Sequence, residues 1–230
     1  MTILRTRFAL LALLIPALWS GAAQAYPCRP DGDAQITLRM QPATPQQIIR
    51  IDQQALVRKT GKPYILGLTE AKAFSVGQYT FGRYADGQEK QCLYITGIDF
   101  TIGYEDVLIY ILGEYPRESC QYGVIHAHEM RHVEILNQEL QRALPGLKQD
   151  LSRISRNLTQ RVRPQRTQQA QRAIETRVRG RVRLAINRAM RRVDRANARI
   201  DTKQAYLAEN RKCRNWRSIA HASQSSQHMD

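Results

Sequence analysis

The chain has 230 residues, of which 43% are hydrophobic, and this size suits one domain with an extension. Its formal net charge is +15 and unevenly spread: residues 141–217 hold 22 Lys and Arg against 5 Asp and Glu, whereas residues 26–140 hold 11 against 14. After residue 25 no apolar run approaches the roughly 18 residues of a membrane span, so we expect a protein that is not transmembrane.

The first 25 residues predict a signal peptide. Arg5 and Arg7 precede an apolar run, and the small residues Ala23 and Ala25 form an A-x-A cleavage site. Cleavage there would leave a mature chain of 26–230 in a periplasmic or secreted location. In that setting nucleic acid is an unlikely partner, and the polyanions to consider are lipid, lipopolysaccharide and wall polymer.

The first elements of the mature chain are a strand and a helix. Residues 34–40 alternate between apolar and polar side chains, which predicts a short strand. Thr44 has the features of a helix N-cap, with Pro45 at the first helical position and a capping-box glutamine after it. We expect this helix to run to about Arg58 and to stop before Gly61.

Residues 64–112 predict a small antiparallel sheet. They are rich in β-branched and aromatic side chains and are interrupted by glycines. The clearest pair of strands is 91–101 and 107–112, joined as a hairpin around 103–106. Together with the HExxH helix, this sheet would form an α+β domain over 26–143.

Two long helices are expected next, folded as an antiparallel, coiled-coil-like hairpin over 144–217. Ser119 is the predicted N-cap of the first helix, and Pro145 should kink or break it. Pro164 predicts the turn, and apolar residues three or four apart between 174 and 207 define the seam of the second helix. Arginines would occupy the outer faces, and 218–230 predicts a disordered tail.

The four cysteines of an exported chain predict two disulfides. Cys120 begins the first long helix and Cys213 ends the second, and the midpoint between them lies beside the predicted turn. Folding the hairpin there favours Cys120–Cys213 and leaves Cys28–Cys92 as the second bond.

The motif HExxH stands at 128–132 on the predicted helix. One helical turn places His128 and His132 on the same face, where both imidazoles can bind one catalytic Zn2+. Glu129 would then serve as the general base on a zinc-bound water and pass the proton to the leaving amine of a peptide. The alternative is two surface histidines beside an ordinary glutamate.

A catalytic zinc needs a third protein ligand. If Cys213 faces Cys120, the register brings Glu209 and Asp201 near the histidines. Glu209 is our first choice as the third ligand and Asp201 the second; the alternative is that both are solvated charges paired with arginines.

Two further side chains concern the expected site. Tyr206 would lie near the first histidine and could donate a hydrogen bond to an oxyanion, although an interhelical tyrosine more often only packs. His126 should point away from the metal. The strands at 91–112 could supply an edge to which an extended peptide pairs.

HExxH on a helix after a strand hairpin resembles the zincin metallopeptidases, specifically the gluzincin type, in which an acidic residue of a later helix completes the site. The chain is also similar to a family of predicted secreted bacterial zinc-dependent proteases, described largely as a domain of unknown function. The likeness covers about 90–140, with His128, Glu129 and His132 as its specific matches. That family has a glycine where this chain has Arg131, and it lacks the arginine-rich hairpin. The resemblance implies an exported zinc metallopeptidase with a peptide or protein substrate.

In an alternative class of function, the basic helical hairpin is the functional part of the protein and binds a partner. Ten arginines between 172 and 199 exceed what solubility requires. A non-enzymatic envelope protein could use them to bind anionic lipid, lipopolysaccharide or wall polymer. The sequence indicates neither the substrate nor the oligomeric state.

Overall fold

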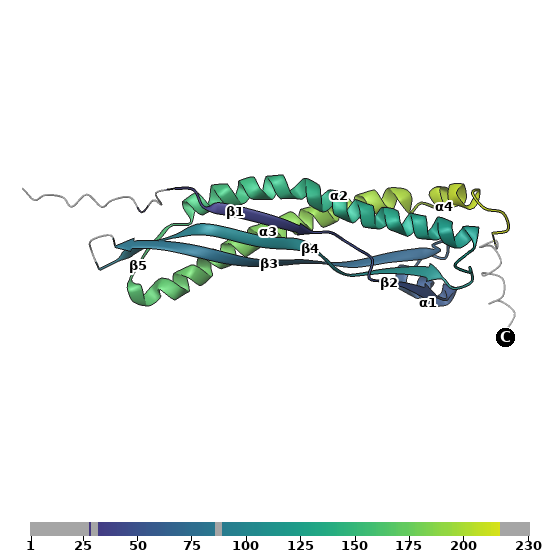
Figure 1. Cartoon of the computed structure of the whole chain (residues 1–230), viewed down its shortest axis with the longest axis horizontal. Helices are drawn as coiled ribbons and strands as arrows, with labels where there is room; N and C mark the ends of the chain where they lie inside the picture. The colour runs from purple at the N-terminus through teal and green to yellow at the C-terminus, as the bar shows by residue number, and fades with distance from the viewer. Residues whose placement is uncertain (1–27, 29–31, 86–88, 217–230) are drawn as a thin grey trace, which may run out of the picture.

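The computed structural model describes residues 28, 32–85 and 89–216. In this part of the chain a long, narrow sheet lies along a hairpin of two long helices, so that the molecule is elongated (Figure 1). The predicted mixture of helix and strand is therefore confirmed. The predicted signal peptide, 1–25, and the predicted tail, 218–230, fall outside the described residues.

The sheet has five strands: β1 (Gln35–Gln41), β2 (Gln47–Ile51), β3 (Gly67–Ala85), β4 (Gln91–Leu112) and β5 (Gln160–Val162). β3 pairs antiparallel with nearly the whole of β4, so β1, β2 and β5 share the opposite edge of β4. β5 is antiparallel, but β1 and β2 run parallel to β4. The expectation of an antiparallel sheet is thus wrong for β1 and β2, and the sheet is mixed.

The prediction of a helix that begins at Thr44 is also wrong for the first half of its length. Residues 47–51 form β2, and the pairing starts with a hydrogen bond from Gln46 N to Val107 O of 2.8 Å. The helix begins later, as α1 (Gln53–Thr60), where the Asp52 side chain accepts from Ala55 N. Pairing with a distant strand therefore overrides a local capping signal. The helix ends, as predicted, at Gly61, whose φ of 68° suits glycine.

The predicted hairpin turn at 103–106 does not exist, because β4 passes through it without a break. Gly103 is instead a point of close approach: a Cβ there would lie 2.2 Å from the Gln41 carbonyl oxygen of β1. Asp106, with φ of 53°, lies opposite a register shift between Glu70 and Lys72 of β3. Glycine and a turn-like residue thus mark a close contact and a bulge within one long strand. Because β4 is paired on both sides, it cannot supply the peptide-binding edge expected at 91–112.

The helices are α2 (Cys120–Asn157), the short 3-10 turn η1 (Pro164–Arg166), α3 (Thr167–Ile200) and α4 (Lys203–Asn210). α2 begins at the predicted N-cap, Ser119, whose side chain accepts from Tyr122 N at 3.1 Å. It continues through Pro145, so the expected break is absent and the predicted boundary at 143 falls inside one helix.

The second predicted helix, expected to run past 207, is interrupted after Ile200. Asp201 ends α3, and Thr202 begins α4 by accepting a hydrogen bond from Ala205 N at 3.0 Å. Leu207, predicted in the buried seam, is 50% exposed. The interruption matters because it changes the direction of the chain next to the HExxH residues.

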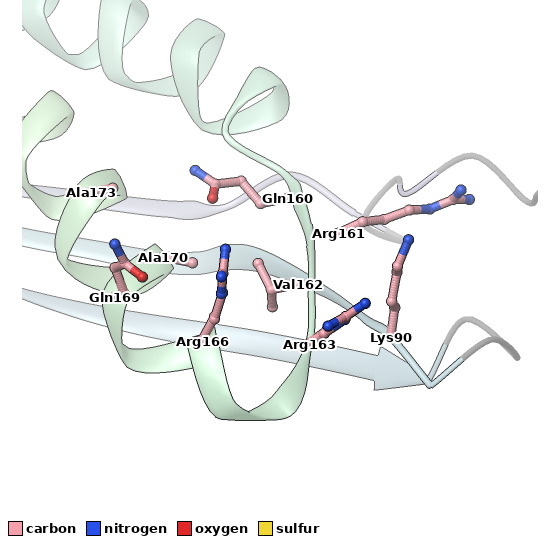
Figure 2. Close-up of a pocket in the computed structure, with 9 residues that line it drawn as sticks. All are labelled: Lys90, Gln160, Arg161, Val162, Arg163, Arg166, Gln169, Ala170 and Ala173. Carbon is pink, nitrogen blue, oxygen red and sulfur yellow. The ribbon is translucent and has the colours of Figure 1, made fainter.

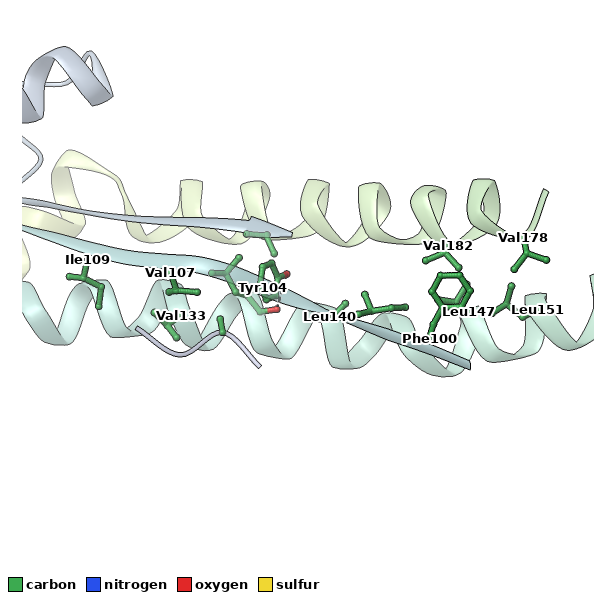
Figure 3. Close-up of a cluster of buried hydrophobic side chains, with 14 of the residues drawn as sticks. Phe100, Tyr104, Val107, Ile109, Val133, Leu140, Leu147, Leu151, Val178 and Val182 are labelled. Carbon is green, nitrogen blue, oxygen red and sulfur yellow. Dashed lines mark hydrogen bonds between the residues drawn. The ribbon is translucent and has the colours of Figure 1, made fainter. Parts of the chain in front are cut away.

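The main core lies between the sheet and the helical hairpin. Side chains of β4 meet those of α2 and α3 there, as Figure 3 shows for Phe100, Leu147 and Val182. Both disulfides join the predicted partners, Cys28–Cys92 and Cys120–Cys213. Among the described residues there is no helix with the length and apolar character needed to cross a membrane.

Candidate metal site at the HExxH helix

The HExxH residues lie on the buried face of α2, near its N-terminal end. His128, Glu129 and His132 are 1%, 0% and 7% exposed. The end of α3 and the buried side of α4, with Tyr206 and Glu209, lie against this face, and the Cys120–Cys213 disulfide ties the chain after α4 to the first residue of α2. The site is therefore built from segments about 70 to 80 residues apart in the sequence.

Three potential ligand atoms converge between α2 and the end of α3. Nε2 of His128 lies 3.2 Å from Nε2 of His132. Oδ1 of Asp201 lies 3.0 Å from the first nitrogen and 3.1 Å from the second. These atoms form a nearly equilateral triangle.

The other ring nitrogen of each histidine has its own partner. Nδ1 of His128 lies 3.0 Å from Oε2 of Glu209, and Nδ1 of His132 lies 3.0 Å from Oδ1 of Asn197. The oxygens of Glu209 and Asn197 favour the tautomer in which Nδ1 carries the proton; the Arg131 guanidinium also lies near Nδ1 of His128, but at the longer distance of 3.4 Å. In a neutral ring of that tautomer Nε2 offers its lone pair to a cation, whereas in a protonated ring Nε2 donates a hydrogen bond to Oδ1 of Asp201. Metal-binding histidines are held by second partners in this way.

The two acidic candidates for the third ligand occupy different sides of His128. Glu209, our first choice from the sequence, contacts Nδ1 and forms an ion pair with Arg131, so it faces away from the point where the two Nε2 atoms meet. Asp201, the second choice, contacts both Nε2 atoms. The geometry therefore reverses the predicted order of the two acids.

Charge at the cluster is set by the contacts around Asp201. Burial alone would raise the pKa of Asp201, but hydrogen bonds with His128 and His132 outweigh it and hold that pKa below its usual range. Burial opposes protonation of His132, yet the hydrogen bond to Asp201 and the charge of Glu129 leave its pKa raised. The two pKa shifts have the same origin: the carboxylate of Asp201 is stabilised by neighbours that carry a proton or a positive charge.

Glu129 lies beneath the first residues of β3. Its Oε2 accepts a hydrogen bond of 2.8 Å from Thr69 Oγ1, while its Oε1 is buried without a hydrogen-bond partner among the described residues. Burial raises the pKa of Glu129. A Cβ on Gly67 would lie 2.5 Å from Oε1, so glycine is needed there to make room for the carboxylate.

Tyr206 of α4 covers the cluster. Its hydroxyl lies 3.1 Å from Nε2 of His128 and 3.4 Å from Oδ1 of Asp201, and its ring packs edge-on against Tyr64. The residue is 4% exposed, and burial raises the pKa of its hydroxyl, which therefore keeps its proton. Sequence register had placed Tyr206 near His128, and the structure agrees.

The donor set fits a zinc ion. Zinc held tetrahedrally at roughly 2.0–2.1 Å from nitrogen and oxygen has ligand atoms about 3.3 Å apart, and the triangle here has edges of 3.0 to 3.2 Å. With protons on both Nδ1 atoms, the triangle consists only of acceptors, which repel one another unless a cation or added protons lie between them. Two imidazoles and a carboxylate are common zinc ligands.

A second grouping shares the two histidines. One ligand atom from each of His128, Glu129 and His132 lies within 4.8 Å of the others. Oδ1 of Asp201 lies within 3.1 Å of both nitrogens, whereas Oε2 of Glu129 accepts a hydrogen bond from Thr69. Glu129 is then beside the cluster with one free oxygen.

Some residues of the site were not predicted from the sequence. Asn197 stands one turn before Asp201 on the same face of α3, so helical spacing could have indicated it. Thr69 and Gly67 carry no such signal, because their place depends on how β3 packs on α2. His126 was expected to point away, and its ring stacks on Tyr122 of the same helix.

The arrangement can bind a divalent cation, hold a buried carboxylate beside it and present one protonated tyrosine hydroxyl. No model of a protein family, no curated protein and no solved structure matches this chain, so the family resemblance stays a prediction.

Proposed function

We propose that the protein is a zinc-dependent hydrolase that cleaves peptide bonds, with Glu129 as its general base. The observation that carries this proposal is the convergence of both Nε2 atoms and Oδ1 of Asp201, beside a buried carboxylate that has one unpartnered oxygen. His128, His132 and Asp201 would hold the ion. When bound, zinc lowers the pKa of a coordinated water to about 7 and polarises a carbonyl.

Glu129 is suited to move a proton. Its raised pKa brings its proton affinity closer to that of the group it serves, and the Thr69 hydroxyl holds Oε2 so that Oε1 faces the reaction space. Oε1 would take a proton from the attacking water and return it to the leaving amine. Gly67 keeps the carboxylate in that position.

Tyr206 is assigned to the substrate oxygen. Its hydroxyl retains its proton, and it lies at hydrogen-bond distance from the ligand atoms of His128 and Asp201. A small rotation of the side chain would aim this donor at the oxyanion that forms when the carbonyl is attacked.

Access to the buried cluster requires movement of a segment that covers it: β3 lies over Glu129, and α4 lies over His128 and Asp201. With 0% exposure, the Glu129 carboxylate touches no substrate in the present arrangement. α4 has only eight residues and joins α3 at a break next to Asp201, while Cys213 ties its far end to α2. We infer that α4 moves away from α2 as substrate enters, because it carries Tyr206 and is the smallest element over the site.

The edge of β3 is the place for an extended substrate. Among the described strands β3 pairs with β4 alone, and its residues 67–69 lie against Glu129. A peptide that adds to this edge would run past the general base.

Metal analysis and a hydrolysis assay on the mature protein test the proposal. The expected result is about one equivalent of zinc, lost in His128→Ala and His132→Ala and kept in His126→Ala, a matched control on the same helix. Glu129→Gln should keep the zinc and lose hydrolysis of casein and of wall-derived peptides. A folded, metal-free protein would contradict the proposal and favour the non-enzymatic, anion-binding alternative.

A further inference from the structure

A basic pocket lies at the connection between α2 and α3. Its volume is about 580 Å³, and it is lined by residues of β5, of η1, of the first turns of α3 and by Lys90 just before β4 (Figure 2). None of the nine lining side chains is acidic. Four are cationic: Lys90, Arg161, Arg163 and Arg166. We call these nine residues the basic pocket.

Three of these cations have no counter-charge. Within the described parts of the chain, the side chains of Lys90, Arg163 and Arg166 form no hydrogen bond and no ion pair. Elsewhere in the protein, arginines beside acidic residues do pair, as Arg192 does with Glu139 at 2.7 Å. Lys90, Arg163 and Arg166 therefore raise the local electrostatic potential of the basic pocket.

The surroundings of the pocket increase the attraction for an anion. A second hollow of about 990 Å³ adjoins it through Lys90 and Arg163 and adds Arg83 and one acidic residue, Glu89, so its lining remains net cationic. Gln160 and Gln169 contribute amide donors to the pocket. The first turn of α3 has no side-chain cap and no acidic residue, so the positive end of the helix dipole is not offset there.

We propose that the basic pocket is a binding site for a phosphorylated ligand with more than one anionic group. Arg163 and Arg166 would bind phosphate oxygens through their planar guanidinium groups, and Lys90 would add a point charge. The volume lies within the range of sites that hold whole small molecules, and a single phosphate would leave most of the cations unused.

The site is independent of the candidate metal site. α2 rises about 1.5 Å per residue, so the 25 residues from His132 to its end at Asn157 separate the two by roughly 37 Å. The pocket also differs in place from the outer-face arginines expected to bind an anionic surface. The phosphate can belong to a lipid headgroup or to a soluble compound.

Two probes and two matched variants test the proposal on the mature, disulfide-bonded protein. The probes are inorganic pyrophosphate, followed by calorimetry, and vesicles of phosphatidylcholine with phosphatidylglycerol, followed by sedimentation. The pocket variant replaces Lys90, Arg163 and Arg166 by Gln. The control variant replaces the exposed Arg172, Arg188 and Arg191 of α3 by Gln, which removes the same charge from the same protein. Circular dichroism and thermal unfolding verify that both variants fold.

We expect saturable pyrophosphate binding that weakens at least tenfold in the pocket variant and less than twofold in the control. If vesicle binding falls in the same pattern and pyrophosphate competes with it, the natural phosphate belongs to a lipid; if vesicle binding is unchanged or absent, it belongs to a soluble ligand. Equal losses in both variants, or no saturable binding of either probe, would overturn the proposal whether or not the protein binds zinc.

Discussion

Oδ1 of Asp201 lies 3.0 Å from Nε2 of His128, although 73 residues separate the two in the sequence. The contact exists because α3 ends at Asp201, where the chain bends into α4 over the HExxH face of α2. A continuous helix would have carried the side chains after Ile200 along a different line. The break in the second helix is therefore part of the construction of the candidate site.

Substitutions of the two acids should separate their roles. Asp201→Ala removes an atom from the triangle, so we expect it to abolish stoichiometric zinc binding. Glu209→Gln removes the negative charge that faces Nδ1 of His128 and pairs with Arg131, but no atom of the triangle, and should weaken zinc binding by about 10- to 100-fold. Titration of both variants against a competing zinc chelator measures the difference. Stronger loss in Glu209→Gln than in Asp201→Ala would restore Glu209 as the ligand.

Tyr206→Phe should leave zinc in place and lower kcat. The loss of one oxyanion donor typically costs about 10²–10³ in kcat, and the ring would keep its packing against Tyr64. Steady-state kinetics with zinc content measured on the same sample checks this. Tyr64→Phe serves as the control, since it changes a neighbouring tyrosine that packs against the same ring. An unchanged kcat in Tyr206→Phe would assign Tyr206 to packing alone.

Gly67→Ala should disturb Glu129 without touching a zinc ligand. The added Cβ would lie 2.5 Å from Oε1, so the carboxylate must move. We expect normal zinc content with strongly reduced hydrolysis, whereas Gly146→Ala, at a helical glycine with open space around it, should behave as wild type. Equal activity of the two variants would show that the position of the Glu129 carboxylate is not critical.

The disulfide Cys120–Cys213 should stabilise both the fold and the site. It closes a loop with a sequence separation of 93 residues, and removal of a native disulfide typically costs about 2–5 kcal/mol. Replacement of both cysteines by Ser should lower the free energy of unfolding by such an amount and weaken zinc binding, because α4 loses its tether. Urea unfolding with and without zinc measures both effects. A variant that binds zinc as tightly as wild type would contradict the role of the tether.

Alkaline pH should destabilise the protein through Tyr104. Burial raises the pKa of Tyr104 to about 12, and its hydroxyl donates to the Leu136 carbonyl oxygen. In the unfolded chain the residue ionises near pH 10, so between pH 10 and 12 the folded state binds more protons and stability falls as pH rises. The expected loss is at most about 3 kcal/mol.

The variant Tyr104→Phe isolates this effect. It lacks the hydrogen bond, so it should be about 1 kcal/mol less stable than wild type at pH 8. The difference should shrink above pH 10 and reverse as the pH approaches 12, because only wild type loses stability through the ionisation of Tyr104 in the unfolded chain. Parallel pH profiles of the two proteins would contradict the prediction.

Sequence patterns that involve only neighbouring residues, such as helix caps and helical periodicity, correctly predicted some helix ends and the helical hairpin. The start of α2 at Ser119, the end of α1 at Gly61 and the antiparallel pairing of the long helices all depend on local caps or on helical periodicity. The predicted pairing of the two helices also gave the correct disulfide partners and placed Tyr206, Asp201 and Glu209 near the two histidines. The helical register was therefore enough to assemble most of the candidate site.

Features that depend on distant partners were missed. Residues 47–51 form a strand because β4 offers them a free edge, and Gly103 serves a close approach of β1 rather than a turn. Thr69 and Gly67 reach Glu129 only through the packing of β3 on α2. The choice between Asp201 and Glu209 depended on where α3 ends, and no residue pattern marked Asp201 as that end.

We propose that His128, His132 and Asp201 hold one zinc ion. The most direct measurement is the zinc content of the purified mature protein after dialysis against metal-free buffer, together with its thermal unfolding with and without added zinc. We expect about one bound zinc and a rise of roughly 3 kcal/mol in the free energy of unfolding at free zinc 100-fold above Kd, both lost in Asp201→Ala. A folded protein without zinc, with the same unfolding temperature at all zinc concentrations, would contradict this proposal.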